Sequence, residues 1–354
     1  MCSLSCASSR VDDVYEYLCV DDFLHTFMDT QSLKCALEMG LIDYLSEQTT
    51  ATKAGIQKHL CSDHAGAELL INTLLANKVV DNNKQGLQLS PQFIIALRYR
   101  DLLEAKIEFI DLIAPDVANL MTPFIQDPGS FMRDSSIFDL FGYQRCFEST
   151  EENVRLTKRW MHFTSAYTKY EARVCMEFHD FSSYHKMLDI GGNSGEFLVQ
   201  ICKQHPILQG TVVDLPVVCY IGQERVSSET EANRIEFIKC NALIDPLPKN
   251  FDVLSFKSFL HDWPEQAVED FINRASQCLK PGGTLLIFER AAIQLDSNKI
   301  LYSMLPMLLF LRSFKKPELY TALLTNAGFE QISVQQVNLE MPFFLITAKK
   351  PLLF

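Results

Sequence analysis

The sequence predicts an α/β fold: a doubly wound parallel sheet in the second half of the chain, preceded by an all-helical part with a winged-helix pattern. Three observations support this. Apolar residues recur at helical spacing through the first hundred residues. Two short apolar runs then flank a polar turn, and from about residue 185 short apolar runs alternate with helical segments. A length of 354 residues suits at least two domains.

The first part of the chain has three expected helices, over about residues 24–41, 54–60 and 67–77. Residues 79–80 and 87–89 flank a polar turn and predict a hairpin, which completes the winged-helix pattern. The third helix carries Leu69, Leu70, Leu74 and Leu75 on one expected side and contains no Lys or Arg. This helix is therefore poorly suited to bind DNA, and we expect it to serve as a dimerisation surface.

The second half alternates strands and helices. Strands are expected over 186–190, 211–214, 235–238, 251–256, 284–288, 331–337 and 343–347, with helices over 197–204, 264–279 and 317–327. Residues between about 100 and 180 read as helical and unusually aromatic. We therefore expect three parts: a winged-helix-like dimerisation domain over 1–100, a helical linker and substrate-pocket segment over 101–180, and a ligand-binding sheet domain over 181–354.

Charge and cysteine usage exclude several classes of function. The net charge of −12 opposes nucleic-acid binding, which depends on Lys and Arg. The eleven cysteines show no metal-ligand spacing, so we expect no metal and a reducing cytoplasm. The segment Met1–Leu4 does not begin a secretory signal. The longest apolar run, Ile300–Leu311, contains Pro306 and is shorter than the roughly 20 residues of a membrane span.

A glycine-rich turn follows the first strand of the expected sheet. Leu188-Asp189-Ile190-Gly191-Gly192-Asn193-Ser194-Gly195 lies where that strand meets a helix, and glycines allow both a tight turn and close approach of a ligand. Asp214 ends the second strand 23 positions after Gly191, where a carboxylate can accept hydrogen bonds from both ribose hydroxyls of an adenosine. The alternative is that Asp214 only begins the turn at Leu215-Pro216.

Together with three further motifs, this turn resembles the S-adenosylmethionine-dependent small-molecule O-methyltransferases, such as the caffeic acid and acetylserotonin enzymes and many bacterial natural-product enzymes. The motifs are Val213-Asp214-Leu215-Pro216, Leu260-His261-Asp262-Trp263 and Leu279-Lys280-Pro281-Gly282-Gly283. The similarity covers nearly the whole chain. It implies a Rossmann-like methyltransferase sheet, a homodimer formed through the N-terminal domain, and S-adenosylhomocysteine as product.

The resemblance also implies the residues that bind the cofactor. They are Asp189, Gly191, Gly192 and Gly195 in the turn; Asp214 and Leu215 at the ribose; Asn241 and Ala242 beside the adenine; Lys257 and Ser258 near the methionine part; and Ser165. Many relatives carry Asp where this chain has Asn241, and an Asn oxygen can still accept a hydrogen bond.

His261 is the expected general base, because its near-neutral pKa allows it to take a proton from a hydroxyl group at cellular pH. Glu289 matches the glutamate that orients this histidine in relatives. The neighbouring Asp262-Trp263-Pro264-Glu265 has the pattern of a helix start, with Asp262 as the cap and Glu265 closing a capping box. An isolated histidine can also have a purely structural role.

The chain departs from the family pattern at one position. Plant relatives carry a second glutamate before the last helix, and here Phe314 lies about where that acid is expected, with Glu318 nearby on the helix. The expected acceptor is a small hydroxylated molecule, aromatic or polyketide-like, in a pocket lined by apolar side chains: Met161, Phe163, Met304 and Met307. Core packing explains each of these residues equally well.

Two other functions remain open from the sequence. An enzyme of the same fold can methylate carbon or nitrogen, or catalyse decarboxylation, hydroxylation or a pericyclic reaction. A winged-helix regulator that senses S-adenosylmethionine is the alternative outside enzymes. His261 and Glu289 favour proton abstraction from oxygen over the other chemistries of this fold. The acidic net charge opposes the regulator.

Overall fold

The computed structural model describes residues 13–293 and 300–352. They divide into two compact units, one containing Tyr15–Gln126 with residues 300–308, and the other containing residues 13–14, 127–293 and 309–352. The segment Met1–Leu4, with Cys2, lies outside the described residues.

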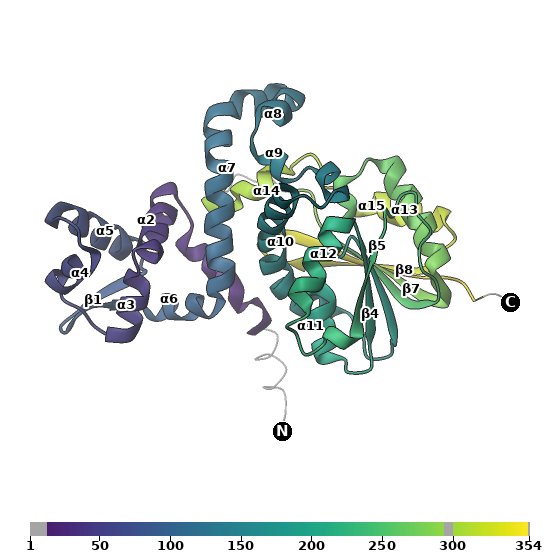
Figure 1. Ribbon diagram of the computed structural model, residues 1–354, viewed down its shortest axis with the longest axis horizontal. Coiled ribbons are helices and arrows are strands. Elements are labelled where there is room, and N and C mark those ends of the chain that lie inside the picture. Colours follow the sequence, from purple (N-terminus) through teal and green to yellow (C-terminus); the bar gives the residue numbers. More distant parts are fainter. Residues whose placement is uncertain (1–12, 294–299, 353–354) are drawn as a thin grey trace, which may run out of the picture. The chain divides into compact units, whose positions relative to one another are not determined.

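The first unit is helical apart from one hairpin (Figure 1). Its elements are η1 (Glu16–Phe23), α2 (Phe27–Glu38), α3 (Leu41–Gln48), α4 (Lys53–Leu60), α5 (His64–Ala76), β1 (Val80–Asn83), β2 (Gly86–Leu89), α6 (Pro91–Ala96), η2 (Leu97–Tyr99), α7 (Arg100–Gln126) and η6 (Tyr302–Met304), from which α14 (Leu305–Leu309) continues. Thr26 and Asp63 cap α2 and α5 by accepting backbone N–H groups of the first turn. The helices and hairpin predicted from the sequence are therefore present.

One prediction for this unit is wrong. Leu69 and Leu70 do not share a face of α5, because Leu70 and Leu74 are buried while Leu69 is 63% exposed. Adjacent residues on a helix point about 100° apart, so only one of each leucine pair can face the core.

The second unit begins with helices and continues as alternating strands and helices. Its elements are α8 (Pro128–Asp134), α9 (Ile137–Leu140), η3 (Tyr143–Phe147), α10 (Glu151–Phe178), β3 (Lys186–Ile190), α11 (Glu196–Gln204), β4 (Gln209–Asp214), α12 (Pro216–Val226), η4 (Ala232–Arg234), β5 (Ile235–Lys239), β6 (Phe251–Lys257), η5 (Leu260–Asp262), α13 (Glu265–Cys278), β7 (Leu279–Arg290), α15 (Pro317–Asn326), β8 (Glu330–Asn338) and β9 (Pro342–Lys349). This confirms the alternation predicted from the sequence.

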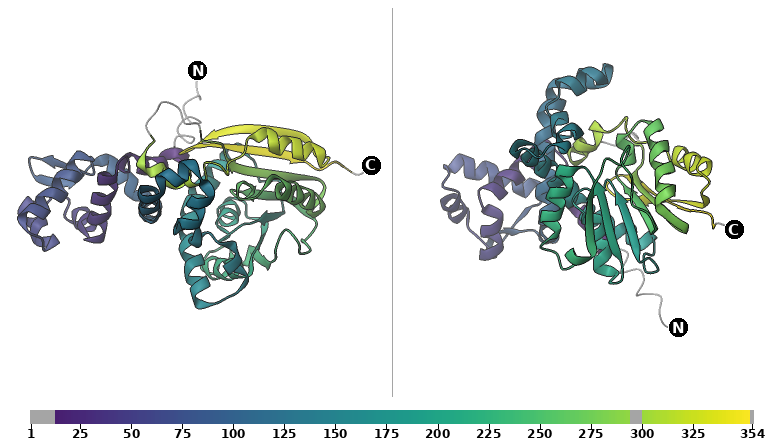
Figure 2. Two further views of the ribbon diagram at one scale, coloured as in Figure 1. Left: turned by 90° about the horizontal axis from the view of Figure 1, so that it is seen from above. Right: turned by 45° about the vertical axis from the view of Figure 1, so that its right-hand side comes forward.

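The strands of the second unit form one seven-stranded sheet in the order β5-β4-β3-β6-β7-β9-β8. The first five of these are parallel, and β9 and β8 are antiparallel additions that lie side by side in Figure 2. The order of the strands reverses between β3 and β6. In such sheets ligands bind at the carboxyl ends of the strands beside this reversal.

The central strands are buried along nearly their whole length, as a sheet covered on both faces requires. Leu188 and Ile190 of β3 belong to the core that also contains Phe271 of α13 and Tyr320 of α15. Asp189, the residue between them, faces the other side of the sheet, and α10 packs against both α11 and α12 in the same unit (Figure 1). Asp189 therefore enters the interior on the face opposite α13.

Two expectations about the whole chain can be compared with the described part. Among the residues that the structure describes, no helix is long and apolar enough to cross a membrane. Nine cysteines in this part of the chain are free thiols.

Candidate active site

The carboxyl ends of four neighbouring parallel strands bring the predicted residues together. Ile190 of β3 pairs with Val213 of β4, and Lys257 of β6 pairs with Phe288 of β7. Asp214 and Glu289 each follow one of these paired residues. The turn at Gly191 and the acids at 214 and 289 therefore lie along one edge of the sheet.

The turn after β3 requires glycine for two local reasons. Gly191 has φ +70°, and a Cβ atom there would lie 2.2 Å from the Phe259 ring. The Gly191 N–H donates to the carbonyl of Val213 at 2.8 Å, and the Asn193 N–H donates to Asp214 Oδ2 at 2.8 Å. The structure thus joins the glycine turn to the acid of the neighbouring strand, as the sequence predicts.

Two buried carboxylates lie at this edge. Asp189 Oδ1 accepts from the Ser255 hydroxyl at 2.5 Å, and its buried Oδ2 has no protein partner. Asp214 accepts the N–H groups of Asn193 and Leu215. Burial raises the pKa of Asp189 to about 7 and that of Asp214 to about 6. Both groups would therefore gain from a positively charged or hydrogen-bond-donating ligand.

Three other predicted cofactor residues lie near these carboxylates. The Ser165 hydroxyl on α10 donates to the Ser194 hydroxyl of the glycine turn at 2.6 Å. The Cys240 N–H donates to the Asp214 carbonyl, which places the loop of Asn241 beside β4. Asn241 Oδ1 accepts from the Leu243 N–H at 3.1 Å, and Ala242 packs partly buried against the core.

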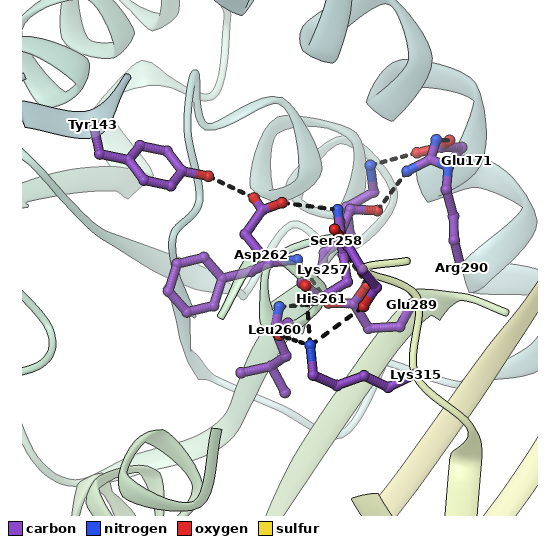
Figure 3. Close-up of polar contacts among 12 residues, drawn as sticks. Tyr143, Glu171, Lys257, Ser258, Leu260, His261, Asp262, Glu289, Arg290 and Lys315 are labelled. Carbon is purple, nitrogen blue, oxygen red and sulfur yellow. Dashed lines mark hydrogen bonds and ion pairs between the residues drawn. The ribbon is translucent and has the colours of Figure 1, made fainter. Parts of the chain in front are cut away.

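Lys257 and Ser258 belong to a buried charge network. Lys257 Nζ forms an ion pair with Glu171 of α10 and donates to the Thr168 hydroxyl at 2.7 Å. Arg290 also pairs with Glu171, and it donates to Ser258 Oγ at 2.9 Å (Figure 3). The sequence places Lys257 and Ser258 at this edge, but it does not reveal Glu171 as their common partner.

The structure pairs the two predicted catalytic residues. His261 Nδ1 lies 2.7 Å from Glu289 Oε2, and both side chains are buried (Figure 3). Glu289 Oε1 accepts the N–H groups of Phe259 and Leu260 at 2.7 and 2.6 Å. Burial alone would raise the pKa of Glu289, but His261 and these N–H groups outweigh it and hold the pKa below its usual range.

Glu289 and the neighbouring Asp262 both act on the histidine. Burial alone would lower the pKa of His261, but the carboxylates of Asp262 and Glu289 outweigh it and raise the pKa. Lys315 Nζ holds the turn itself by donating to the carbonyls of His261 and Leu260 at 3.0 and 3.4 Å. The imidazole is therefore fixed in orientation, and the two carboxylates stabilise a positive charge on it.

The capping prediction for this turn is wrong. Helix α13 begins at Glu265 with Pro264 at the cap position and no side-chain capping bond. Asp262 instead lies in η5, where its Oδ2 accepts from the Tyr143 hydroxyl at 2.5 Å. The sequence did not single out Tyr143, because 119 residues separate it from Asp262 and nothing in its spacing marks it among the many aromatic residues of that region.

The predicted acceptor residues are distributed over both units. Met161 and Phe163 are buried on α10, where two positions of separation point their side chains to nearly opposite faces. Met304 ends η6 and Met307 is buried in α14, both in the first unit. In the second unit, the rings of Phe310 and Phe314 lie 6.2 and 5.4 Å from the imidazole of His261.

A cleft of about 670 Å³ opens beside the histidine. It is lined by two segments of the second unit, His261–Glu265 and Arg312–Lys316, together with Glu318 and Leu319. Within the described ranges, no group of three or more His, Cys, Asp or Glu side chains is arranged to hold a metal ion.

Comparison with known proteins identifies the family. The profile of the O-methyltransferase domain family matches residues 126–330, more than half of the chain. The chain belongs to this family. It is therefore an S-adenosylmethionine-dependent O-methyltransferase, as the resemblance in the sequence implies.

Individual relatives agree with this assignment. A 3-hydroxy-5-methyl-1-naphthoate 3-O-methyltransferase of Streptomyces sahachiroi is 32% identical over 157 residues, which are 43% of this chain and 45% of that protein. The acetylserotonin O-methyltransferase of Bos taurus is 23% identical over 342 residues, covering 91% of this chain and 95% of that protein. The structure of human N-acetylserotonin methyltransferase with S-adenosylmethionine has the same fold, with a TM-score of 0.72, 21% identity and coverage of 99% and 100%.

The residues at the sheet edge fit the methyl donor. S-adenosylmethionine carries a sulfonium, an ammonium group and two ribose hydroxyls, and the edge offers acceptors for such groups. The unpartnered buried Oδ2 of Asp189 suits a cationic group, and the Asp214 carboxylate has acceptor capacity beyond the two N–H groups that it binds.

Proposed function

We propose that this O-methyltransferase methylates a hydroxyl group of a small aromatic molecule, with His261 as the general base and Glu289 as its orienting partner. The observation that carries this proposal is the 2.7 Å contact between His261 Nδ1 and Glu289 Oε2. A glutamate on Nδ1 fixes the tautomer in which Nε2 is free to take a proton.

S-adenosylmethionine supplies the reaction with an electrophilic methyl group on a sulfonium. Asp214 would bind its ribose, and Asp189, Lys257 and Ser258 would lie near its methionine part. His261 Nε2 removes the proton of the acceptor hydroxyl as the oxygen is methylated. Glu289 then stabilises the imidazolium, and the buried setting strengthens that interaction.

The acceptor class follows from the side chains around the base. Phe310 and Phe314 lie against the imidazole ring, and Phe141 contacts Phe310 edge-on at 5.6 Å. Aromatic walls of this kind favour a flat, apolar ligand with few polar groups. The substrates in the names of two relatives, a hydroxynaphthoate and acetylserotonin, are hydroxylated aromatic molecules and support the same class.

The test is an acceptor panel followed by one substitution. The full chain is incubated with S-adenosylmethionine carrying a ¹³C methyl group and with 3-hydroxynaphthoate, N-acetylserotonin and hydroxylated polyketides, and products are analysed by mass and by NMR. With the acceptor that reacts, His261→Ala is expected to lower turnover by roughly a hundredfold or more and to leave binding of S-adenosylhomocysteine nearly unchanged. His64→Ala, an exposed histidine on α5, is the matched control.

Two results would contradict the proposal. Equal turnover in the parent and His261→Ala proteins would remove His261 from the mechanism. A labelled methyl group on carbon or nitrogen of the product would favour the alternative chemistry of the same fold.

We further propose that residues 1–100 form a dimerisation domain, residues 101–180 a linker and pocket segment, and residues 181–354 the donor-binding domain. Large apolar side chains stay exposed on the first unit, among them Phe27, Met28 and Leu69, which supports a homodimer. Light scattering on the parent and on Leu69→Asp would test it.

The nine free thiols support a cytoplasmic location. Helix α5 has no Lys or Arg, which opposes DNA binding and a regulatory role.

A further inference from the structure

Each ring nitrogen of His261 faces a carboxylate. Glu289 Oε2 lies 2.7 Å from Nδ1, and Asp262 Oδ1 lies 3.3 Å from Nε2. Only Nδ1 is in hydrogen-bond contact with its acid; the Asp262 carboxylate acts on the ring by its charge, which attracts an imidazolium more strongly than a neutral imidazole. The arrangement therefore matches the histidine after it has taken a proton.

Tyr143 fixes the second acid in this position. Its hydroxyl donates to Asp262 Oδ2 at 2.5 Å, which leaves Oδ1 toward the imidazole (Figure 3). The Tyr143 ring is stacked on Trp263, with centroids 5.8 Å apart and planes 7° from parallel, and meets Trp160 edge-on at 5.9 Å. Burial and the charge of Asp262 hold the pKa of Tyr143 well above its usual value, so the hydroxyl stays a donor.

We infer that Asp262, held by the Tyr143 hydroxyl, is a second carboxylate partner of His261 and stabilises the imidazolium by its charge, 3.3 Å from Nε2. This inference rests on the proposed role of His261 as the base. The Phe314 ring, which has no charge, lies 5.4 Å from the imidazole. Asp262 and Tyr143 are positioning residues, since both act through His261.

The proton then has a defined route. As the acceptor oxygen gains the methyl group, its O–H bond breaks and the proton moves to Nε2, while the electron pair of the broken carbon–sulfur bond stays on the sulfur. The charge of the new imidazolium is stabilised by Asp262, whose side chain is 23% exposed and lines the open cleft of about 670 Å³. After the methylated product has left, water in that cleft can take the proton from Nε2 and return His261 to its neutral form.

The charged groups around His261 determine whether its pKa rises or falls when Asp262 is replaced. Asp262 faces it from its own turn, Glu289 and Arg290 from β7, Lys315 from the segment before α15, and the Tyr143 hydroxyl reaches Asp262 from η3. The two carboxylates raise the pKa of His261, and Arg290 opposes them. Removing the charge of Asp262 should therefore lower the pKa of His261.

The first experiment measures this pKa directly and needs no acceptor. Imidazole groups of the full chain are labelled with ¹⁵N and titrated by NMR with S-adenosylhomocysteine bound, and the His261 signals are those absent from a His261→Gln protein. In Asp262→Asn the pKa of His261 should fall by about one unit or more. Tyr143→Phe keeps both charges and the ring, and it should give a smaller fall in the same direction.

Glu318→Gln is the matched control. Glu318 lines the same cleft and loses the same charge, but it is not among the groups that shift the pKa of His261, so this pKa should stay constant in the variant. An unshifted pKa in Asp262→Asn, or an equal shift in Glu318→Gln, would overturn the inference. An unshifted pKa in Tyr143→Phe would remove Tyr143 from it.

Turnover with the acceptor found in the panel separates this inference from the proposed function. Asp262→Asn should lower kcat about tenfold, leave the KM for S-adenosylmethionine unchanged and move the acid limb of the pH profile of kcat/KM to lower pH. Loss of activity in His261→Ala together with a parent-like profile in Asp262→Asn overturns only the role of Asp262. Retained activity in His261→Ala overturns the role of His261 itself.

Discussion

Replacing Glu289 by Gln changes one oxygen of a buried carboxylate into an NH₂ group with little change of shape. Oε1 accepts from the N–H groups of Phe259 and Leu260, and the glutamine oxygen can keep both bonds. The new NH₂ group then faces His261 Nδ1, where Oε2 lies 2.7 Å away in the parent. It must donate to Nδ1, which moves the histidine proton to Nε2 and removes the lone pair that accepts the substrate proton.

The size of the effect follows from the lost charge interaction. Two unit charges about 4 Å apart at an effective dielectric constant of about 20 interact by about 4 kcal/mol. This corresponds to a fall in kcat of about a thousandfold, since each 1.36 kcal/mol changes a rate tenfold. The assay is single-turnover methyl transfer to the acceptor found in the panel, with binding of S-adenosylhomocysteine measured by calorimetry on the same protein.

The control is Glu330→Gln, which removes the same charge from an exposed position at the start of β8. It should leave kcat and donor binding unchanged. A Glu289→Gln protein that binds the donor and turns over within threefold of the parent would refute the tautomer argument.

Four further outcomes follow from the site and the core. Gly191→Ala should lower the free energy of unfolding by about 2–4 kcal/mol in a urea titration, because φ is +70° and Phe259 occupies the space of a Cβ atom. Asp214→Asn should weaken binding of S-adenosylhomocysteine at least tenfold by calorimetry. Burial raises the pKa of Asp189 to about 7 and of Asp214 to about 6, so both acids become neutral as pH falls. The affinity for the donor should therefore increase as the pH rises from about 5.5 to about 7.5, and an affinity that falls over this range would contradict this fit. Phe256→Ala, at a fully buried position, should cost about 3–5 kcal/mol by thermal unfolding, and a loss below about 1 kcal/mol would show that the core can close around the gap.

The sheet could be predicted from the sequence because its strands are short apolar runs bounded by turn residues. The strand pattern at 186–190 became β3 with the same bounds, and the turn at Gly191 lies where the sequence places it. Apolar residues alone did not predict which side chains of α5 are buried, since Leu69 is exposed beside the buried Leu70. Periodicity identifies the helix, but the neighbours decide which of two adjacent leucines is covered.

The site could be predicted as far as it is local in sequence or carried by a family motif. His261 and Glu289 were found because both lie at strand ends in recognised patterns, and they are in contact. The Tyr143–Asp262 contact was not found, because it joins η3 to η5 across 119 residues. The local pattern at Asp262 even indicated a helix cap, and tertiary contacts to Tyr143 and His261 replaced that role.

The most direct test of the central claim is a crystal structure of the full chain with bound S-adenosylhomocysteine. We predict that the ribose hydroxyls donate to the Asp214 carboxylate, that the chain at Gly191 runs along the ligand, and that His261 Nε2 faces the sulfur across the space for an acceptor. A ligand bound away from Asp214, or an imidazole separated from the sulfur by packed side chains, would contradict the account.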